Sequence, residues 1–152
     1  MVAAPKHRKA LVGMLLADSR LAETQLRYAD ARGRRTRVPR DWRLCRLCMN
    51  DVGDTLHALF VCSASRDLTA LRDALWRKCA EEKTGGGLQR LPSRECFHRM
   101  LLDIPLVPVL AKFAYDVLAV FEKVNMFVAS EAYWHGQDPR GETRPDALDA
   151  ML

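Results

Sequence analysis

The sequence predicts a mainly α-helical fold: a small helical domain with an embedded Cys-Cys-His-Cys zinc-binding loop in segment 44–63. Apolar residues recur every three or four positions in several stretches, which is the spacing of one helix face. No stretch alternates convincingly as a strand does, and short strands are expected only around the cysteine pair. With 152 residues, 49% of them hydrophobic, the chain can build one core, so we expect a single domain over residues 1–135.

Two helices are predicted near the N-terminus, the first over residues 6–17. Its apolar residues at helical spacing are Ala10, Leu11, Met14 and Leu15. Asp18 or Ser19 is suited to cap a second, short helix. The apolar residues of this second helix are Leu21, Ala22 and Leu26.

The sequence after the cysteine segment predicts a strong helix over residues 67–83. Asp67 suits its N-terminus, because a carboxylate interacts favourably with the positive end of the helix dipole. Its inward residues are expected to be Leu68, Leu71, Leu75 and either Cys79 or Trp76. Three consecutive glycines within residues 84–87 then break the helix.

Two more helices are expected in the C-terminal half. One covers residues 93–103 with Ser93 as its cap, and a long one covers about residues 107–134. The polar residues 136–152 contain proline and glycine and predict a disordered tail. No uninterrupted apolar run approaches the roughly 18 residues of a membrane span, so no membrane partner is expected.

Positive charge is concentrated in the first third of the chain. Residues 1–48 hold 12 Lys/Arg and 4 Asp/Glu, a net +8, whereas residues 49–152 hold 12 and 15, a net −3. The basic arm, residues 32–46, begins in a stretch without apolar periodicity, which predicts a loop or extended arm. Such clustering is typical of polyanion binding, although a merely solvated basic surface fits the charge equally well.

Arginine side chains of this arm are the candidate phosphate ligands, because the guanidinium fork binds phosphate oxygens bidentately. Trp42 fits two roles: stacking on an unpaired base, or filling space as a hydrophobic plug under the metal loop. The candidate nucleic-acid-binding residues are Arg32, Arg34, Arg35, Arg37, Arg40, Trp42, Arg43 and Arg46.

The candidate metal ligands are Cys45, Cys48, His57 and Cys62. Two thiolates separated by two residues can grip one ion across a tight turn. Asp54 or Thr55 can cap a short helix that carries His57 and ends near Cys62, where slight unwinding lets both ligands face the ion. Three thiolates and one imidazole form a closed tetrahedral site, so one structural zinc ion is the predicted cofactor.

Other readings of these residues are weaker. A catalytic zinc of the deaminase type needs a glutamate two residues after the histidine, and that position is Leu59. The cysteines could instead be core thiols, or a redox pair, but the latter needs a βαβ setting that the sequence lacks. Cys79 and Cys96 lie on apolar helix faces and are expected to be buried thiols. The motif Tyr28-Ala29-Asp30 lacks the second aspartate of a polymerase active-site box.

The segments HRKALVGMLLADSRLA, VPRDWRLCRLC, DTLHALFVC and LTALRDAL together resemble a known family. They are similar to the zinc-binding C-terminal region of reverse transcriptases from non-LTR (LINE-type) retrotransposons, particularly fungal-type copies, over roughly residues 6–128. The resemblance implies the same four metal ligands and a module that helps a polymerase hold RNA or DNA. It implies a reverse transcriptase polypeptide as a partner and a nuclear, intracellular location.

The function expected from the sequence is therefore non-catalytic binding of the RNA or DNA backbone with weak sequence specificity. No catalytic motif of a polymerase or endonuclease is present, and no small-molecule substrate is expected. The alternative is a zinc-stapled protein–protein interaction module without a nucleic-acid role, in which the apolar helix near residues 107–127 or the acidic tail engages a protein.

Overall fold

The structure is a computed structural model that describes residues 3–29, 32–33, 35–82 and 85–134. It confirms a mainly helical fold. The α-helices are α1 (Pro5–Leu15), α2 (Ala22–Gln25), α3 (Arg66–Glu81), α4 (Ser93–Leu102) and α5 (Val107–Glu122). Shorter helical turns are η1 (Arg40–Trp42), η2 (His57–Val61), η3 (Leu88–Arg90) and η4 (Glu131–Tyr133). The predicted tail lies outside the described residues.

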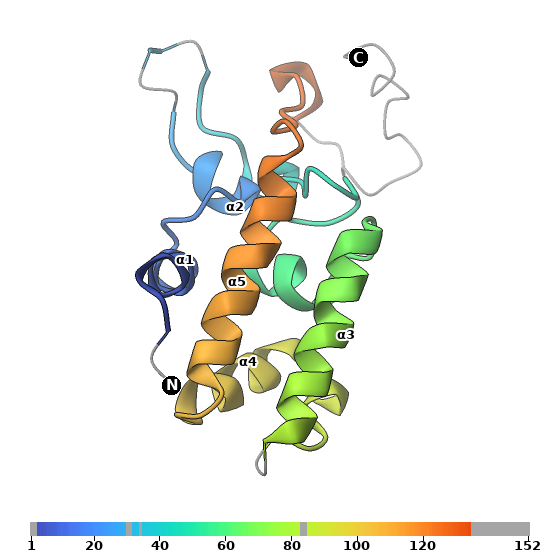
Figure 1. The fold of residues 1–152 in the computed structure, drawn as a ribbon. Coiled ribbons are helices and arrows are strands. Elements are labelled where there is room, and N and C mark those ends of the chain that lie inside the picture. The colour runs from blue at the N-terminus through green and yellow to red at the C-terminus, as the bar shows by residue number, and fades with distance from the viewer. Residues whose placement is uncertain (1–2, 30–31, 34, 83–84, 135–152) are drawn as a thin grey trace.

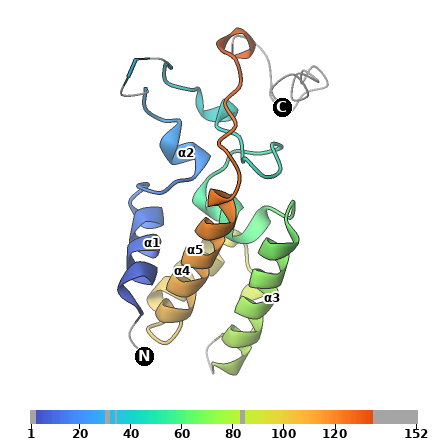
Figure 2. The same ribbon diagram turned by 45° about the horizontal axis from the view of Figure 1, so that its top comes forward.

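Helix α5 is the central element, and α1, α3 and α4 pack against it (Figures 1 and 2). Most residues of α5 are apolar. The helix is buried along most of its length because neighbouring helices cover several of its faces. Buried residues of α5 are Leu110, Ala111, Phe113, Ala114, Val117, Val120 and Phe121. The core is completed by inward residues of α3 and α4, including Leu68, Leu75, Cys96 and Met100.

Phe60 attaches the segment that carries the candidate metal ligands to this helical body. Its ring centroid lies 6.1 Å from that of Trp76, 6.4 Å from Phe97 and 6.3 Å from Phe113. These three rings come from α3, α4 and α5. Aromatic pairs at such separations contribute more than their buried area alone, so η2 is held by all three helices.

The prediction of one helix over residues 107–134 is wrong at its C-terminal end, because α5 stops at Glu122. The following chain turns away and packs with the base of the arm in a second core cluster. That cluster is formed by Ala22, Leu26, Val38, Trp42 and Ala129, with Met126, Phe127, Val128, Tyr133 and Trp134 against it. Apolar residues after Glu122 therefore serve a different core from the one that the helical periodicity suggested.

Smaller differences concern helix caps and strands. Pro92 occupies the cap position of α4, whose first residue is Ser93, and Ser93 is therefore not the cap. Helix α2 starts after Leu21, and Ser19 accepts a hydrogen bond from the Leu21 N–H at 3.4 Å instead of capping the helix. Around the cysteine pair a single antiparallel bridge replaces the expected short strands. In the part of the chain that the structure describes, no helix is both long and apolar enough to cross a membrane.

Candidate metal centre

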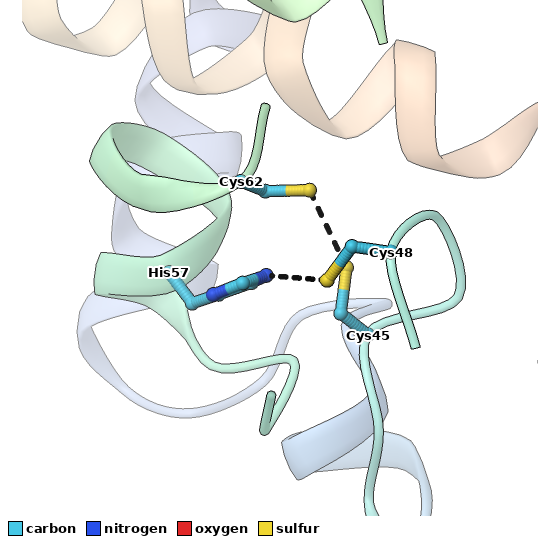
Figure 3. A group of neighbouring side chains, drawn as sticks. All are labelled: Cys45, Cys48, His57 and Cys62. Atoms are coloured by element: carbon cyan, nitrogen blue, oxygen red, sulfur yellow. Dashed lines mark hydrogen bonds between the residues drawn. The ribbon is translucent and has the colours of Figure 1, made fainter. Parts of the chain in front are cut away.

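The four predicted ligands converge at one point between η2 and the loop that follows η1 (Figure 3). Their ligand atoms all lie within 4.8 Å of one another. The Sγ atoms of Cys45 and Cys62 are 3.7 Å apart, and Cys48 Sγ is 3.3 Å from His57 Nε2. The prediction that these four residues lie together is confirmed, and they are positioned to bind a metal ion.

The cysteine pair sits on a short, tightly hydrogen-bonded loop. The Cys45 N–H donates to the Asp51 carbonyl at 2.8 Å, and the Met49 N–H donates to the Cys45 carbonyl at 2.8 Å. Gly53 closes the loop, and its backbone N–H donates to the Arg43 carbonyl at 2.9 Å. A Cβ at position 53 would lie 3.0 Å from the Cys45 Cα and 3.1 Å from the Ala22 Cβ, so a larger residue would push these segments apart by a few tenths of an ångström.

His57 and Cys62 face the same point because the backbone between them is a wide turn. In a regular α-helix, residues five apart are rotated by about 140° from each other. Here η2 is a π-helical turn, and the Cys62 N–H donates to the His57 carbonyl five residues back, at 2.8 Å. Such turns are rare and occur frequently at functional sites. The expected unwinding is thus present as one π turn.

The donor geometry fits a tetrahedral metal ion. With metal–sulfur bonds of about 2.3 Å and metal–nitrogen bonds of about 2.0 Å, a tetrahedral site places two sulfurs about 3.8 Å apart and a sulfur and nitrogen about 3.5 Å apart. The observed separations of 3.7 Å and 3.3 Å need only small adjustments to enclose an ion. Cys45, His57 and Cys62 are buried and Cys48 is half-buried, so the four protein ligands would close the site to solvent.

Contacts within the cluster shift the pKa values of two candidate ligands, Cys45 and Cys62. The hydrogen bond between the two buried sulfurs lowers the pKa of Cys62 and raises the pKa of Cys45. Cys62 therefore gives up its proton more easily than an ordinary thiol does. On His57, Nε2 faces Cys48 and Nδ1 is buried without a hydrogen-bond partner among the described residues.

Arg46, which is buried, and Arg72, which is half-buried, provide positive charge beside the four candidate ligands. Arg72 of α3 donates from Nε to the Leu59 carbonyl at 2.7 Å and from Nη2 to the Ala58 carbonyl at 3.2 Å. Burial lowers the pKa of Arg72, and the nearby Cys62 opposes that shift. Burial likewise lowers the pKa of Arg46, opposed first by Cys45. Three thiolates around a divalent ion leave a net charge of about −1, and these guanidinium groups balance it.

Arg43 and Arg46, which the sequence suggested as phosphate ligands, are instead used inside the protein. Arg46 donates from Nη1 to the carbonyls of Phe121 (3.2 Å) and Val124 (3.0 Å), and from Nη2 to the carbonyl of Arg20. Arg43 donates from Nε to the Val38 carbonyl at 3.0 Å and from Nη1 to Glu23 at 3.2 Å. Neither guanidinium is available to nucleic acid.

Trp42 is not a base-stacking platform, because only 4% of the residue is exposed. Its ring lies in the second core cluster with Leu26 and Val38. Trp42 is thus a buried hydrophobic side chain, as one of its two predicted roles required, but it packs in the second core cluster and not in the cluster that contains the candidate metal ligands. The prediction failed for the stacking role because the segment after α5, far away in sequence, covers the ring.

The other basic residues of the arm remain at the surface. Arg32, Arg37 and Arg40 are exposed, and Arg40 lies 3.9 Å from an Asp54 oxygen. Arg35 is half-buried and donates to the carbonyls of Thr36 (3.2 Å) and Gln25 (3.5 Å). Arg34 lies outside the described residues.

The sequence did not point to Glu23 and Arg72, which hold neighbouring segments in place. Glu23 binds Arg43, and Arg72 binds backbone carbonyls of η2. Glu23 pairs with Arg27 at 2.8 Å and with Arg43 at 3.2 Å. Its spacing of four residues from Arg27 on a helix was a usable signal. Nothing in the local sequence marks Arg72, because its partners lie 13 and 14 residues away.

The two remaining cysteines are not ligands. Cys79 and Cys96 are buried in the main core, as the sequence predicted. Burial raises the pKa of each thiol to about 11, so both stay protonated at neutral pH. Neutral, enclosed thiols behave as small apolar side chains.

Replacing Asp54 by alanine is expected to weaken metal binding and to lower the free energy of unfolding by about 1 kcal/mol. Asp54 Oδ1 accepts a hydrogen bond from the His57 N–H at 2.9 Å and so holds the first turn that carries this ligand. Asp54→Asn retains an acceptor at this position and serves as the control. Urea unfolding and competition with a colorimetric zinc chelator would measure the two effects. Equal values for the alanine and asparagine variants would contradict the capping role.

Comparison of the chain with protein-family models, with curated proteins and with solved structures finds no match.

Proposed function

We propose that the chain is a nucleic-acid-binding module whose Cys3His centre holds one structural zinc ion. The ion would be zinc because three thiolates and an imidazole in a closed tetrahedral arrangement are its usual structural ligands. When bound, it would cross-link the loop of Cys45 and Cys48 to η2. This closed ligand set has no open position for a substrate, so the role of the ion would be to stabilise the fold.

The observation that carries the nucleic-acid role is the placement of the exposed arginines. The chain between α2 and η1 projects from the helical body (Figures 1 and 2). Arg32 and Arg37 are exposed in this part of the sequence, and Arg40 is exposed at the start of η1. The loop is fixed at its base by the Val38 N–H, which donates to the Leu26 carbonyl at 3.2 Å. It leads through the buried Trp42 directly into the metal loop. A rigid base with cations beyond it suits contacts to phosphates.

Binding of this kind would depend strongly on salt and weakly on sequence, because phosphate contacts carry no base information. The similarity to the C-terminal region of LINE-type reverse transcriptases suggests that the module would assist such a polymerase in the nucleus. It would bring RNA or DNA to the enzyme without catalysing a reaction itself.

The double variant Arg32→Glu/Arg37→Glu is expected to lower affinity for RNA at least about tenfold and to reduce the salt dependence of binding. Arg90→Glu/Arg94→Glu is the matched control, because both residues are exposed near η3 and α4 and the net charge changes equally. Fluorescence anisotropy at several salt concentrations measures the affinity for RNA and its salt dependence. Equal affinity in the two double variants would contradict the proposal, and circular dichroism would verify that each variant is folded.

One observation favours a protein-binding role as the second candidate. Leu102 and Ile104, at the turn between α4 and α5, are 84% and 83% exposed. They border a groove of about 500 Å³. Exposed apolar residues that border a groove are typical of protein contacts. A module with only this role would show no salt-dependent affinity for nucleic acid in the same titration.

A further inference from the structure

We infer that Tyr28, which lies just before the basic arm, is a base-stacking residue and that the ligand is a single-stranded polynucleotide. This inference rests on the proposed function and goes beyond it, because it adds a contact that reads unpaired bases. Tyr28 would take the base-stacking role that was suggested for Trp42, which is buried.

Tyr28 is set apart by its exposure. The residue is 65% exposed, and it is the sole aromatic among the exposed large hydrophobic residues in the described part of the chain. The remaining aromatic rings there are buried or half-buried. Much of Tyr28, just before the arm, is therefore accessible to a ligand.

The backbone just before Tyr28 is held by several contacts, so the side chain is presented from a fixed base. Two residues before it, Leu26 is buried and its carbonyl accepts the hydrogen bond from Val38. The neighbouring Arg27 forms a two-pronged ion pair with Glu23, at 2.8 Å and 2.9 Å. Arg35 reaches across from the other side of the arm to the Gln25 carbonyl at 3.5 Å. Little conformational freedom of the backbone would be lost when a base stacks.

The surroundings of Tyr28 supply the second requirement for binding single strands. Proteins that bind single strands combine a positively charged track for the phosphates with aromatic rings for the bases. Arg32, Arg37 and Arg40 provide exposed cations on the same loop. Their guanidinium groups would contact the backbone while the Tyr28 ring stacks on a base.

Duplex DNA or RNA would not stack its bases on Tyr28. Base faces are covered by neighbouring pairs in a double helix, so a tyrosine ring could not reach them without extrusion of a base. The base edges of the major groove are read by a helix or a β-ribbon that enters it. Among the described residues next to the arm, the helical elements are α2 with 4 residues and η1 with 3 residues. Selection for unpaired bases follows from this geometry.

The test compares Tyr28→Ala and Tyr28→Phe in the full chain with zinc present. Labelled oligo(U), oligo(dT) and a duplex of mixed sequence are the probes, measured by fluorescence anisotropy. Leu16→Ala is the matched control, because Leu16 is 73% exposed after α1 and its replacement also removes exposed apolar area. We expect Tyr28→Ala to weaken single-strand binding about tenfold, the effect of losing one stacked base. Tyr28→Phe and Leu16→Ala should bind like the original protein.

The outcomes separate the inference from the function on which it rests. Unchanged single-strand affinity in Tyr28→Ala, alongside a loss in Arg32→Glu/Arg37→Glu, would overturn the stacking role and leave the nucleic-acid function intact. An equal loss for duplex and single strand would also overturn it. If the original protein binds none of the probes in low salt, the proposed function itself fails. Oligo(U) and oligo(dT) together show whether the strand is RNA or DNA.

Discussion

Replacing Cys45 by serine is expected to abolish zinc binding and to lower the free energy of unfolding by about 4 kcal/mol or more. The reason is that the ion would connect two segments, the cysteine loop and η2. Without it, a buried hydroxyl would face the thiols of Cys48 and Cys62. Elemental mass spectrometry of the dialysed protein measures the zinc content, and urea unfolding measures the stability.

Cys79→Ser is the matched control for this experiment. Both cysteines are buried, with exposed fractions of 0% for Cys45 and 1% for Cys79, and both variants introduce the same hydroxyl. Cys79 is not a candidate ligand, so its variant should retain one zinc per chain. Its free energy of unfolding should fall only by the cost of burying a hydroxyl. Equal zinc content and equal stability in the two variants would refute the metal centre. A strong chelator added to the original protein should reproduce the Cys45→Ser result.

Replacing Arg46 by alanine is expected to lower the free energy of unfolding by about 4 kcal/mol, although this residue is not a metal ligand. Its guanidinium donates to carbonyls of Arg20, Phe121 and Val124 and so joins the metal loop to the end of α5. Hydrogen bonds to a charged group contribute about 1.5–3 kcal/mol each, and buried carbonyls left without a donor add to the loss. Denaturant unfolding would measure the change.

The control for Arg46→Ala is Arg37→Ala, which removes the same side chain from an exposed position of the arm. A substitution there should change stability by less than about 0.5 kcal/mol. Arg46→Lys should recover only part of the lost stability, because one ammonium group cannot reproduce the planar fork. Hydrogen exchange of the Val124 amide, which bonds to the Phe121 carbonyl, should accelerate in Arg46→Ala. Similar stabilities for the alanine variants of Arg46 and Arg37 would refute the structural role.

Local sequence patterns were sufficient to predict most of the helices and the cluster of four candidate metal ligands. The helix predicted over residues 67–83 is α3, because a regular apolar repeat and an acidic first turn are local properties. The spacing of Cys45, Cys48, His57 and Cys62 predicted the cluster correctly, because two tight turns and one short helix bring them together. The widened turn between His57 and Cys62 was likewise foreseeable, since a five-residue separation does not share a face on a regular helix.

Only the tertiary structure decided which basic and aromatic residues stay accessible. Arg43, Arg46 and Trp42 belong to the same basic sequence as Arg37, yet they are buried by partners that are distant in the chain. Arg46, for example, reaches a carbonyl 75 residues away. The end of α5 was misjudged for the same reason, because an apolar residue after Glu122 has the same local pattern whether it faces the main core or the second cluster. Composition and periodicity determine that a residue can be buried, whereas the packing of distant segments determines where, and that packing leaves Tyr28 as the exposed ring.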